Sequence, residues 1–79
     1  MTTPAQIRAA RGLLDWSQTK LAEVAGVTLM TVKRIEGDES SRVSEETVEK
    51  VAEALRLADV QFIAENGGGA GVRFRKGEP

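Results

Sequence analysis

The sequence predicts a mainly α-helical fold of four helices followed by a short C-terminal β-hairpin. Four stretches repeat apolar residues at helical spacing, and each begins just after a Ser or Thr suited to cap a helix N-terminus. Further along, two short alternating runs flank a glycine-rich segment, which is typical of a β-hairpin. We expect two parts, a helical domain over residues 1–58 and the hairpin over residues 59–79.

The first helix is predicted to begin at Thr3. The stretch Thr3-Pro4-Ala5-Gln6 places a capping hydroxyl first, Pro at the first helical position and Gln three residues after the cap. Gly12 is expected to loosen or end this helix, and Arg8 is expected to point away from the core toward a phosphate. The residues expected to form the apolar face are Ile7, Ala10 and Leu14.

Two short helices are predicted to meet at a tight turn containing Gly26, which tolerates a left-handed backbone. The first runs from Ser17 to Ala25 and the second from Thr28 to Gly37. In both, a large apolar residue precedes the cap and another follows five positions later, which fixes the entry of the chain into the helix. These apolar pairs are Trp16 with Leu21 and Val27 with Val32, and the other inward positions are Val24, Ala25 and Ile35.

The fourth helix is predicted from Ser44 to Leu57, after a loop over residues 37–42. Its core stripe consists of Val48, Val51, Ala52 and Leu55. Its outer face carries Glu45, Glu46, Glu49 and Glu53. Paired carboxylates can serve in hydrolases, but without His or an evident pocket we interpret them as a solvated helix face.

The C-terminal hairpin is predicted from two β-rich runs, residues 60–65 and 72–76, around residues 66–71. An isolated hairpin is only marginally stable in water. Because both faces carry apolar side chains, we expect it to supply a homodimer contact through Phe62, Ile63 and Phe74. The glycine run lacks the Lys-Ser/Thr and the helix of a phosphate-binding loop.

Composition excludes several functional classes. Cys and His are absent, which excludes disulfides, thiolate metal sites and histidine catalysis. We therefore expect no catalytic residues, no metal and no cofactor. We also expect a cytoplasmic protein with no membrane partner, because no apolar run approaches the ~20 residues of a membrane span and no signal-peptide pattern is present.

The net charge of −1 is unevenly distributed. Residues 1–35 hold five Lys or Arg and two Asp or Glu, whereas residues 36–59 hold three and eight. A basic N-terminal half backed by an acidic segment would orient the molecule toward phosphate. Ordinary surface charge explains the same asymmetry equally well.

The stretch from Trp16 to Gly37 resembles the DNA-binding helix-turn-helix of the lambda-repressor-like (XRE/Cro) family. The wider resemblance covers roughly residues 6–57. It implies that Ala22 is small because the next helix packs against it, and that Arg11 pairs with Glu36. A phosphate contact is the alternative for Arg11. The matching residues are Gln18, Leu21, Ala22, Gly26, Val27, Val32, Ile35 and Glu36.

The resemblance also implies DNA-contacting residues. Those expected to face base edges are Leu29, Met30, Lys33 and Arg34. Those expected to bind phosphate are Gln18, Thr19, Lys20, Thr31 and Arg42. Leu29 and Met30 depart from the polar residues often found at these positions, so they indicate contact with thymine methyl groups, weak base readout, or a surface that meets protein.

The function implied is that of a sequence-specific transcriptional regulator, a repressor that binds double-stranded operator DNA and has no enzymatic activity. A domain this small makes few contacts, so we expect a homodimer on half-sites about 34 Å apart. The alternative is an antitoxin-like or protein-interaction module whose tail binds a partner protein. An enzyme is disfavoured because no residue set supplies nucleophile, base and orienting group.

Overall fold

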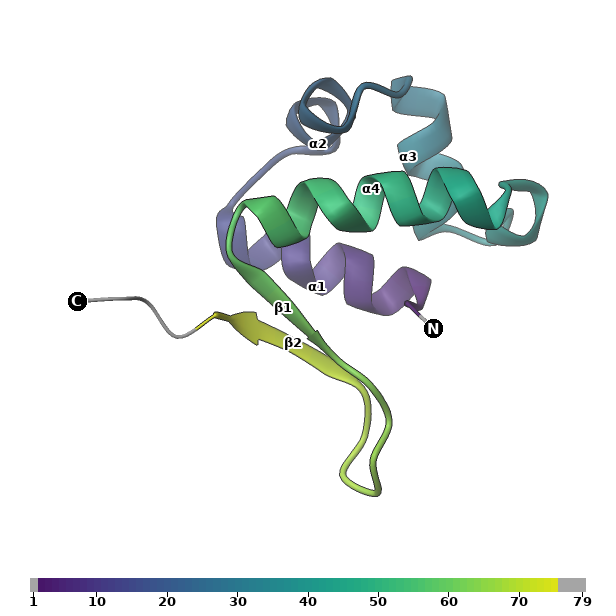
Figure 1. Cartoon of the computed structure of the whole chain (residues 1–79). Helices are drawn as coiled ribbons and strands as arrows, with labels where there is room; N and C mark the ends of the chain where they lie inside the picture. Colours follow the sequence, from purple (N-terminus) through teal and green to yellow (C-terminus); the bar gives the residue numbers. More distant parts are fainter. Residues whose placement is uncertain (1, 76–79) are drawn as a thin grey trace.

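The computed structural model describes residues 2–75 and confirms the predicted mainly helical fold with a two-stranded hairpin. Helices α2 and α3 lie together at the top of Figure 1, α1 and α4 cross the middle, and the hairpin lies below them. A single 3₁₀ turn, η1, interrupts the loop before α4. The elements are α1 (Pro4–Leu14), α2 (Gln18–Ala25), α3 (Leu29–Glu36), η1 (Ser40–Arg42), α4 (Glu45–Leu57), β1 (Val60–Ile63) and β2 (Gly71–Phe74).

Each of the four α-helices begins at a predicted hydroxyl cap. The side chains of Thr3, Ser17, Thr28 and Ser44 each accept a hydrogen bond from the backbone N–H three residues later, at 3.0–3.2 Å. Such a cap contributes about 1 kcal/mol relative to alanine. The helix starts therefore follow from local sequence signals.

The end of the first helix differs from the prediction. Helix α1 continues through Gly12 to Leu14, and the chain turns at Asp15 with a left-handed φ of 57°. One Gly costs a helix only about 1 kcal/mol relative to Ala, which is too little to end a helix anchored by buried Ile7 and Ala10. Gly26, by contrast, ends α2 as predicted, with a φ of 74°.

One apolar core joins all four helices to the first strand. The largest fully buried side chains come from α1, α2, α3, α4 and β1. Val24 was predicted to face inward but is 45% exposed, because Leu21, Ala22 and Ala25 form the buried stripe of α2. These largest fully buried side chains are Ile7, Leu21, Val32, Ile35, Val51, Leu55 and Val60.

The hairpin packs one of its faces on this core. Strands β1 and β2 are antiparallel, with Val60 opposite Phe74 and Phe62 opposite Val72. Val60 is fully buried, and Phe62 and Val72 pack against the core cluster. The alternating residue Ile63 belongs to the other face. Lys76, at the end of the predicted second strand, lies outside the described residues.

A buried glutamine fastens the hairpin to α1. Gln6 completes the predicted capping box, because its Oε1 accepts a hydrogen bond from the Thr3 backbone N–H at 2.9 Å. Its Nε2 donates to the carbonyls of Ile63 at 3.1 Å and Gly71 at 3.0 Å. The same side chain therefore starts α1 and holds both strands against it.

Candidate nucleic-acid interface

Helix α3 is divided into a buried side and an exposed side. Val32 and Ile35 are buried in the core beneath it. Leu29 is 37% and Met30 55% exposed. The four residues expected to face base edges share the exposed side, which we call the α3 face: Leu29, Met30, Lys33 and Arg34.

The turn between α2 and α3 is fixed by backbone hydrogen bonds. The N–H groups of Gly26 and Val27 both donate to the carbonyl of Ala22, at 2.9 and 3.0 Å. The left-handed conformation of Gly26 makes this arrangement possible. Ala22 is buried, as the resemblance implied. The two helices consequently form one rigid unit that presents the α3 face.

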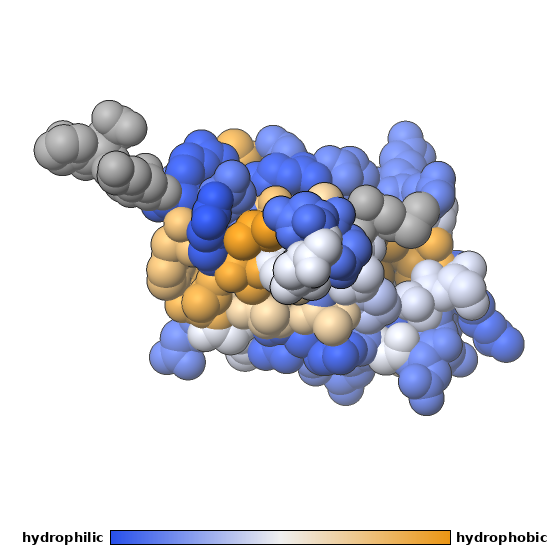
Figure 2. Space-filling model, turned by 90° about the horizontal axis from the view of Figure 1, so that it is seen from below, coloured by the Kyte–Doolittle hydropathy of each residue, from blue (hydrophilic) through white to orange (hydrophobic). Residues whose placement is uncertain are grey.

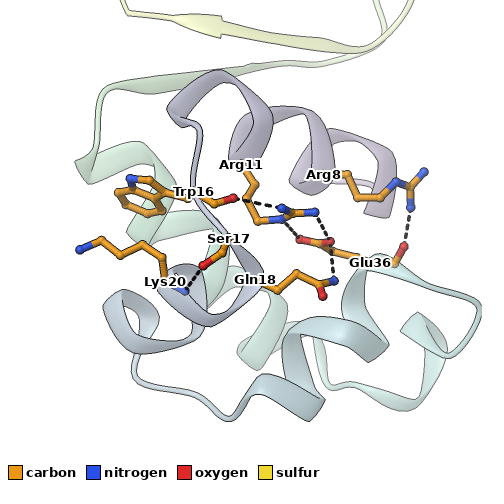
Figure 3. Close-up of polar contacts among 7 residues, drawn as sticks. All are labelled: Arg8, Arg11, Trp16, Ser17, Gln18, Lys20 and Glu36. Carbon is orange, nitrogen blue, oxygen red and sulfur yellow. Dashed lines mark hydrogen bonds and ion pairs between the residues drawn. The ribbon is translucent and has the colours of Figure 1, made fainter.

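A buried carboxylate joins α3 to the helices before it (Figure 3). Arg11 donates from Nε to Glu36 Oε2 at 2.9 Å and from Nη2 to Oε1 at 3.0 Å. Gln18 Nε2 donates to the same Oε1 at 3.0 Å. Glu36 is only 5% exposed. The Arg11–Glu36 pair that the resemblance implied is thus present and bidentate, which is the strong geometry for this interaction.

Arg11, Gln18 and Glu36 form what we call the Glu36 cluster, and two further hydrogen bonds from arginine side chains connect it to the backbone. Arg11 Nη1 donates to the Trp16 carbonyl at 3.0 Å, so the loop before α2 is also held. Arg8 was expected to reach outward to a phosphate, but its Nη1 donates to the backbone carbonyl of Glu36. A cation beside the last carbonyls of a helix is favourable because the helix C-terminus carries partial negative charge.

The residues expected to bind phosphate do not all have free polar groups. Thr19 and Lys20 are exposed in the first turn of α2, and Lys20 Nζ lies 5.9 Å from the centre of the Trp16 ring. Gln18 is half-buried and uses one amide hydrogen on Glu36, as Figure 3 shows. The Thr31 hydroxyl lies 3.0 Å from that of Thr28, the cap of α3.

Sequence reasoning missed the position of Glu39. Its Oε1 lies 3.6 Å from Arg34 Nε, and its Oε2 lies 3.7 Å from Arg42 Nη1. The carboxylate therefore brings a candidate base-reading residue and a candidate phosphate-binding residue together. The spacing of Glu39 and Arg42, three residues apart, was the available signal. Both pairs are exposed, so each contributes little to stability.

The acidic face of α4 borders a groove that the sequence did not reveal. The groove has a volume of about 630 Å³ and lies between the starts of α1 and α4 beside η1. Glu45 and Glu49 line it together with apolar and hydroxyl side chains. Glu49 is already bound by Arg56 at 2.6 Å, which lowers the pKa of its carboxyl through the hydrogen bond. This carboxylate is consequently committed to an ion pair.

A metal-binding group of acidic side chains and a membrane-spanning helix are both absent from residues 2–75. No three acidic side chains in that range are placed to hold a metal ion. No helix there has the length and apolar character that crossing a membrane requires.

Comparison with known proteins agrees with this geometry. A family model described as helix-turn-helix matches residues 7–61, from the first half of α1 to the start of β1. A search of curated proteins gives no match to the chain.

Proposed function

Since the chain belongs to the lambda-repressor-like helix-turn-helix family, whose members are DNA-binding transcription regulators, we propose that it represses transcription by binding a specific operator through α3. The observation that carries the proposal is the α3 face, where two cationic and two apolar side chains lie exposed on a helix buried along its other side. The Glu36 cluster supports the same conclusion, because it fixes α3 relative to α1 and α2.

Base reading is assigned to the middle of α3. The guanidinium of Arg34 can donate two hydrogen bonds to guanine O6 and N7, and Lys33 can donate to the same acceptors. In the free protein Arg34 is paired with Glu39 at 3.6 Å. DNA binding therefore requires Arg34 to exchange an exposed carboxylate for a base edge, which is a small cost.

Phosphate binding is assigned to the residues around the first turn of α2 and to two flanking positions. The N-terminus of α2 carries free N–H groups and partial positive charge, which suit a phosphate oxygen. Gln18 retains one amide hydrogen for this contact, and Glu36 orients its amide group. The full assigned set is Gln18, Thr19, Lys20, Thr31 and Arg42.

The hairpin is assigned a homodimer contact. It lies below α1 and α4, on the side of the molecule away from α2 and α3, so it remains free when α3 binds DNA (Figure 1). Figure 2, which views the hairpin side, shows apolar side chains gathered on this surface. Phe74 is 51% exposed and Ile63 half-buried, whereas Phe62 packs partly on the protein's own core. Phe74 and Ile63 lie on opposite faces of the hairpin, so the contact is centred on the more exposed Phe74.

Selection from a pool of random DNA duplexes with the full-length protein tests this function. Enrichment of a palindrome with half-site centres about 34 Å apart is the expected result. Arg34→Ala should lose preference at one guanine, at a cost of about 1–3 kcal/mol. Arg73→Ala is the matched control, because it removes the same charge from β2, far from α3, and it should leave the preference at that guanine unchanged.

The competing assignment is a protein-interaction module of the antitoxin type. An unrelated chain that co-purifies with the protein, together with no enriched DNA sequence, would favour that module over the repressor. The repressor acts in the cytoplasm, where its DNA is, and performs no catalysis.

A further inference from the structure

We propose that Leu29 and Met30 recognise thymine methyl groups, so that each half-site carries thymine about two base pairs from the guanine read by Arg34. This inference rests on the proposed function, and it specifies which DNA sequences α3 accepts. Leu29 and Met30 then determine which DNA sequence is bound, although neither side chain can hydrogen-bond to a base.

The first turn of α3 offers only apolar side chains for base contact. Thr28 caps the helix, and its hydroxyl oxygen accepts the Thr31 N–H at 3.1 Å. The two hydroxyl groups also hydrogen-bond to each other at 3.0 Å. Because Thr28 caps the helix and Thr31 is assigned to phosphate, Leu29 and Met30 are the remaining side chains at the end of the helix that approaches base edges in this family.

The composition of α3 limits the ways in which this helix can recognise an A·T pair. Its sequence, LMTVKRIE, contains neither Asn nor Gln, the side chains that bond to adenine N6 and N7. On the thymine side of the pair, the C5 methyl group is the apolar feature exposed in the major groove. Apolar contact with that methyl is therefore the direct way in which the α3 face can select an A·T pair.

The spacing along the helix sets the spacing in the DNA. Met30 and Arg34 are four residues apart and so lie on one face, about 6 Å apart along the axis. The same holds for Leu29 and Lys33. Successive bases of a strand are about 3.4 Å apart. Methyl contact and guanine contact should thus occur about two base pairs apart.

Charge favours DNA over a protein as the partner of this apolar pair. Lys33 and Arg34 follow it on the same face of α3, and Lys20 is exposed in the first turn of α2. A small apolar pair within a cationic surface matches a major groove, which presents methyl groups between two rows of phosphates.

Single replacement of thymine by deoxyuridine tests the proposal, because it keeps base pairing and removes only the methyl group. The probe is the duplex enriched from the random pool, with each thymine replaced in turn and affinity measured by fluorescence anisotropy at fixed salt. At one or two thymines we expect about four-fold weaker binding, the value for losing one buried methyl group.

Alanine variants then assign the contact. Leu29→Ala or Met30→Ala should abolish the difference between thymine and deoxyuridine at its own position, with unchanged helicity because both residues are exposed. Leu57→Ala, at the end of α4 and 78% exposed, is the matched apolar control and should retain the difference.

Three results would overturn the proposal in distinguishable ways. An enriched sequence with no sensitivity to deoxyuridine would leave the repressor function standing and remove the methyl contact. Sensitivity that persists in both alanine variants would place methyl recognition elsewhere and leave the pair for a protein contact. Failure to enrich any sequence would overturn the repressor function and this inference together.

Discussion

Glu36→Gln should be among the most destabilising single-atom changes in this protein. Glu36 is 5% exposed, and its two oxygens accept three hydrogen bonds from Arg11 and Gln18. An amide in its place keeps one acceptor oxygen and turns an NH₂ group toward a donor. Arg11, whose side chain is 24% exposed, then loses its counter-charge.

The expected cost is about 3 kcal/mol. Removing one partner of a buried ion pair costs about 3–5 kcal/mol, and the partial exposure of Arg11 puts this pair at the lower end. A domain of this size unfolds with about 4–12 kcal/mol. The melting temperature should therefore fall by roughly 12–24 °C, at about 4–8 °C per kcal/mol.

Urea unfolding followed by fluorescence measures the loss. Trp16 is the single tryptophan of the chain, and its carbonyl accepts a hydrogen bond from Arg11, so the fluorophore lies beside the perturbed cluster. Glu49→Gln is the matched control, because it makes the same change in an exposed carboxylate that also pairs with an arginine. Its cost should stay below about 1 kcal/mol.

Equal costs for the two variants would refute the reasoning. That result would mean that burial does not amplify the Arg11–Glu36 interaction and that something else holds α3 against α1. A second variant sharpens the test. Replacing both partners, Arg11→Met with Glu36→Leu, should recover most of the stability, because no buried charge is then left unpaired.

Four further changes test the remaining assignments. Lys20→Ala should weaken binding to all duplexes alike and reduce the slope of log affinity against log salt by about 1; an unchanged slope would exclude a phosphate contact. Phe74→Ser should give monomers in analytical ultracentrifugation, and a dimeric variant would place the interface elsewhere. Glu39→Gln should strengthen DNA binding several-fold at low salt, because it removes a carboxylate that competes with DNA for two arginines; equal affinity would contradict that competition. Hydrogen bonding by Arg56 lowers the folded-state pKa of Glu49. The unchanged protein should therefore be slightly more stable than Glu49→Gln above the ordinary pKa of about 4.3, and this difference should disappear as the pH falls through the lower folded-state pKa. Urea unfolding at pH 7 and pH 3 measures that difference, and an equal difference at both pH values would contradict the ion pair.

Most helix boundaries were predictable because their signals are local. A cap and the N–H that it binds are three residues apart, so Thr3, Ser17, Thr28 and Ser44 marked the helix starts correctly. The α3 face was also readable, since Val32 and Ile35 left the other residues of a short helix exposed. Gly12 was expected to loosen or end α1. Its weak preference against helix was outweighed by the burial of Ile7 and Ala10.

The candidate site was predicted less completely. Arg8 looked like a free surface cation, yet it bonds to a carbonyl 28 residues away. Glu39 was assigned no role, yet its carboxylate lies 3.6 Å from Arg34 across the end of α3. The three hairpin residues predicted for the dimer contact also differ in burial. Phe62 packs against the core, whereas Phe74 remains exposed.

The sequence by itself determined the four capped helices, the rigid turn at Gly26 and the two strands, since each depends on residues a few positions apart. Only the tertiary structure decided the distant partners of polar side chains such as Arg8 and Gln6. Gln6 illustrates the reason, because its amide bonds to carbonyls 57 and 65 residues along the chain. Such partners become neighbours only after the helices have packed, so no spacing in the sequence records them.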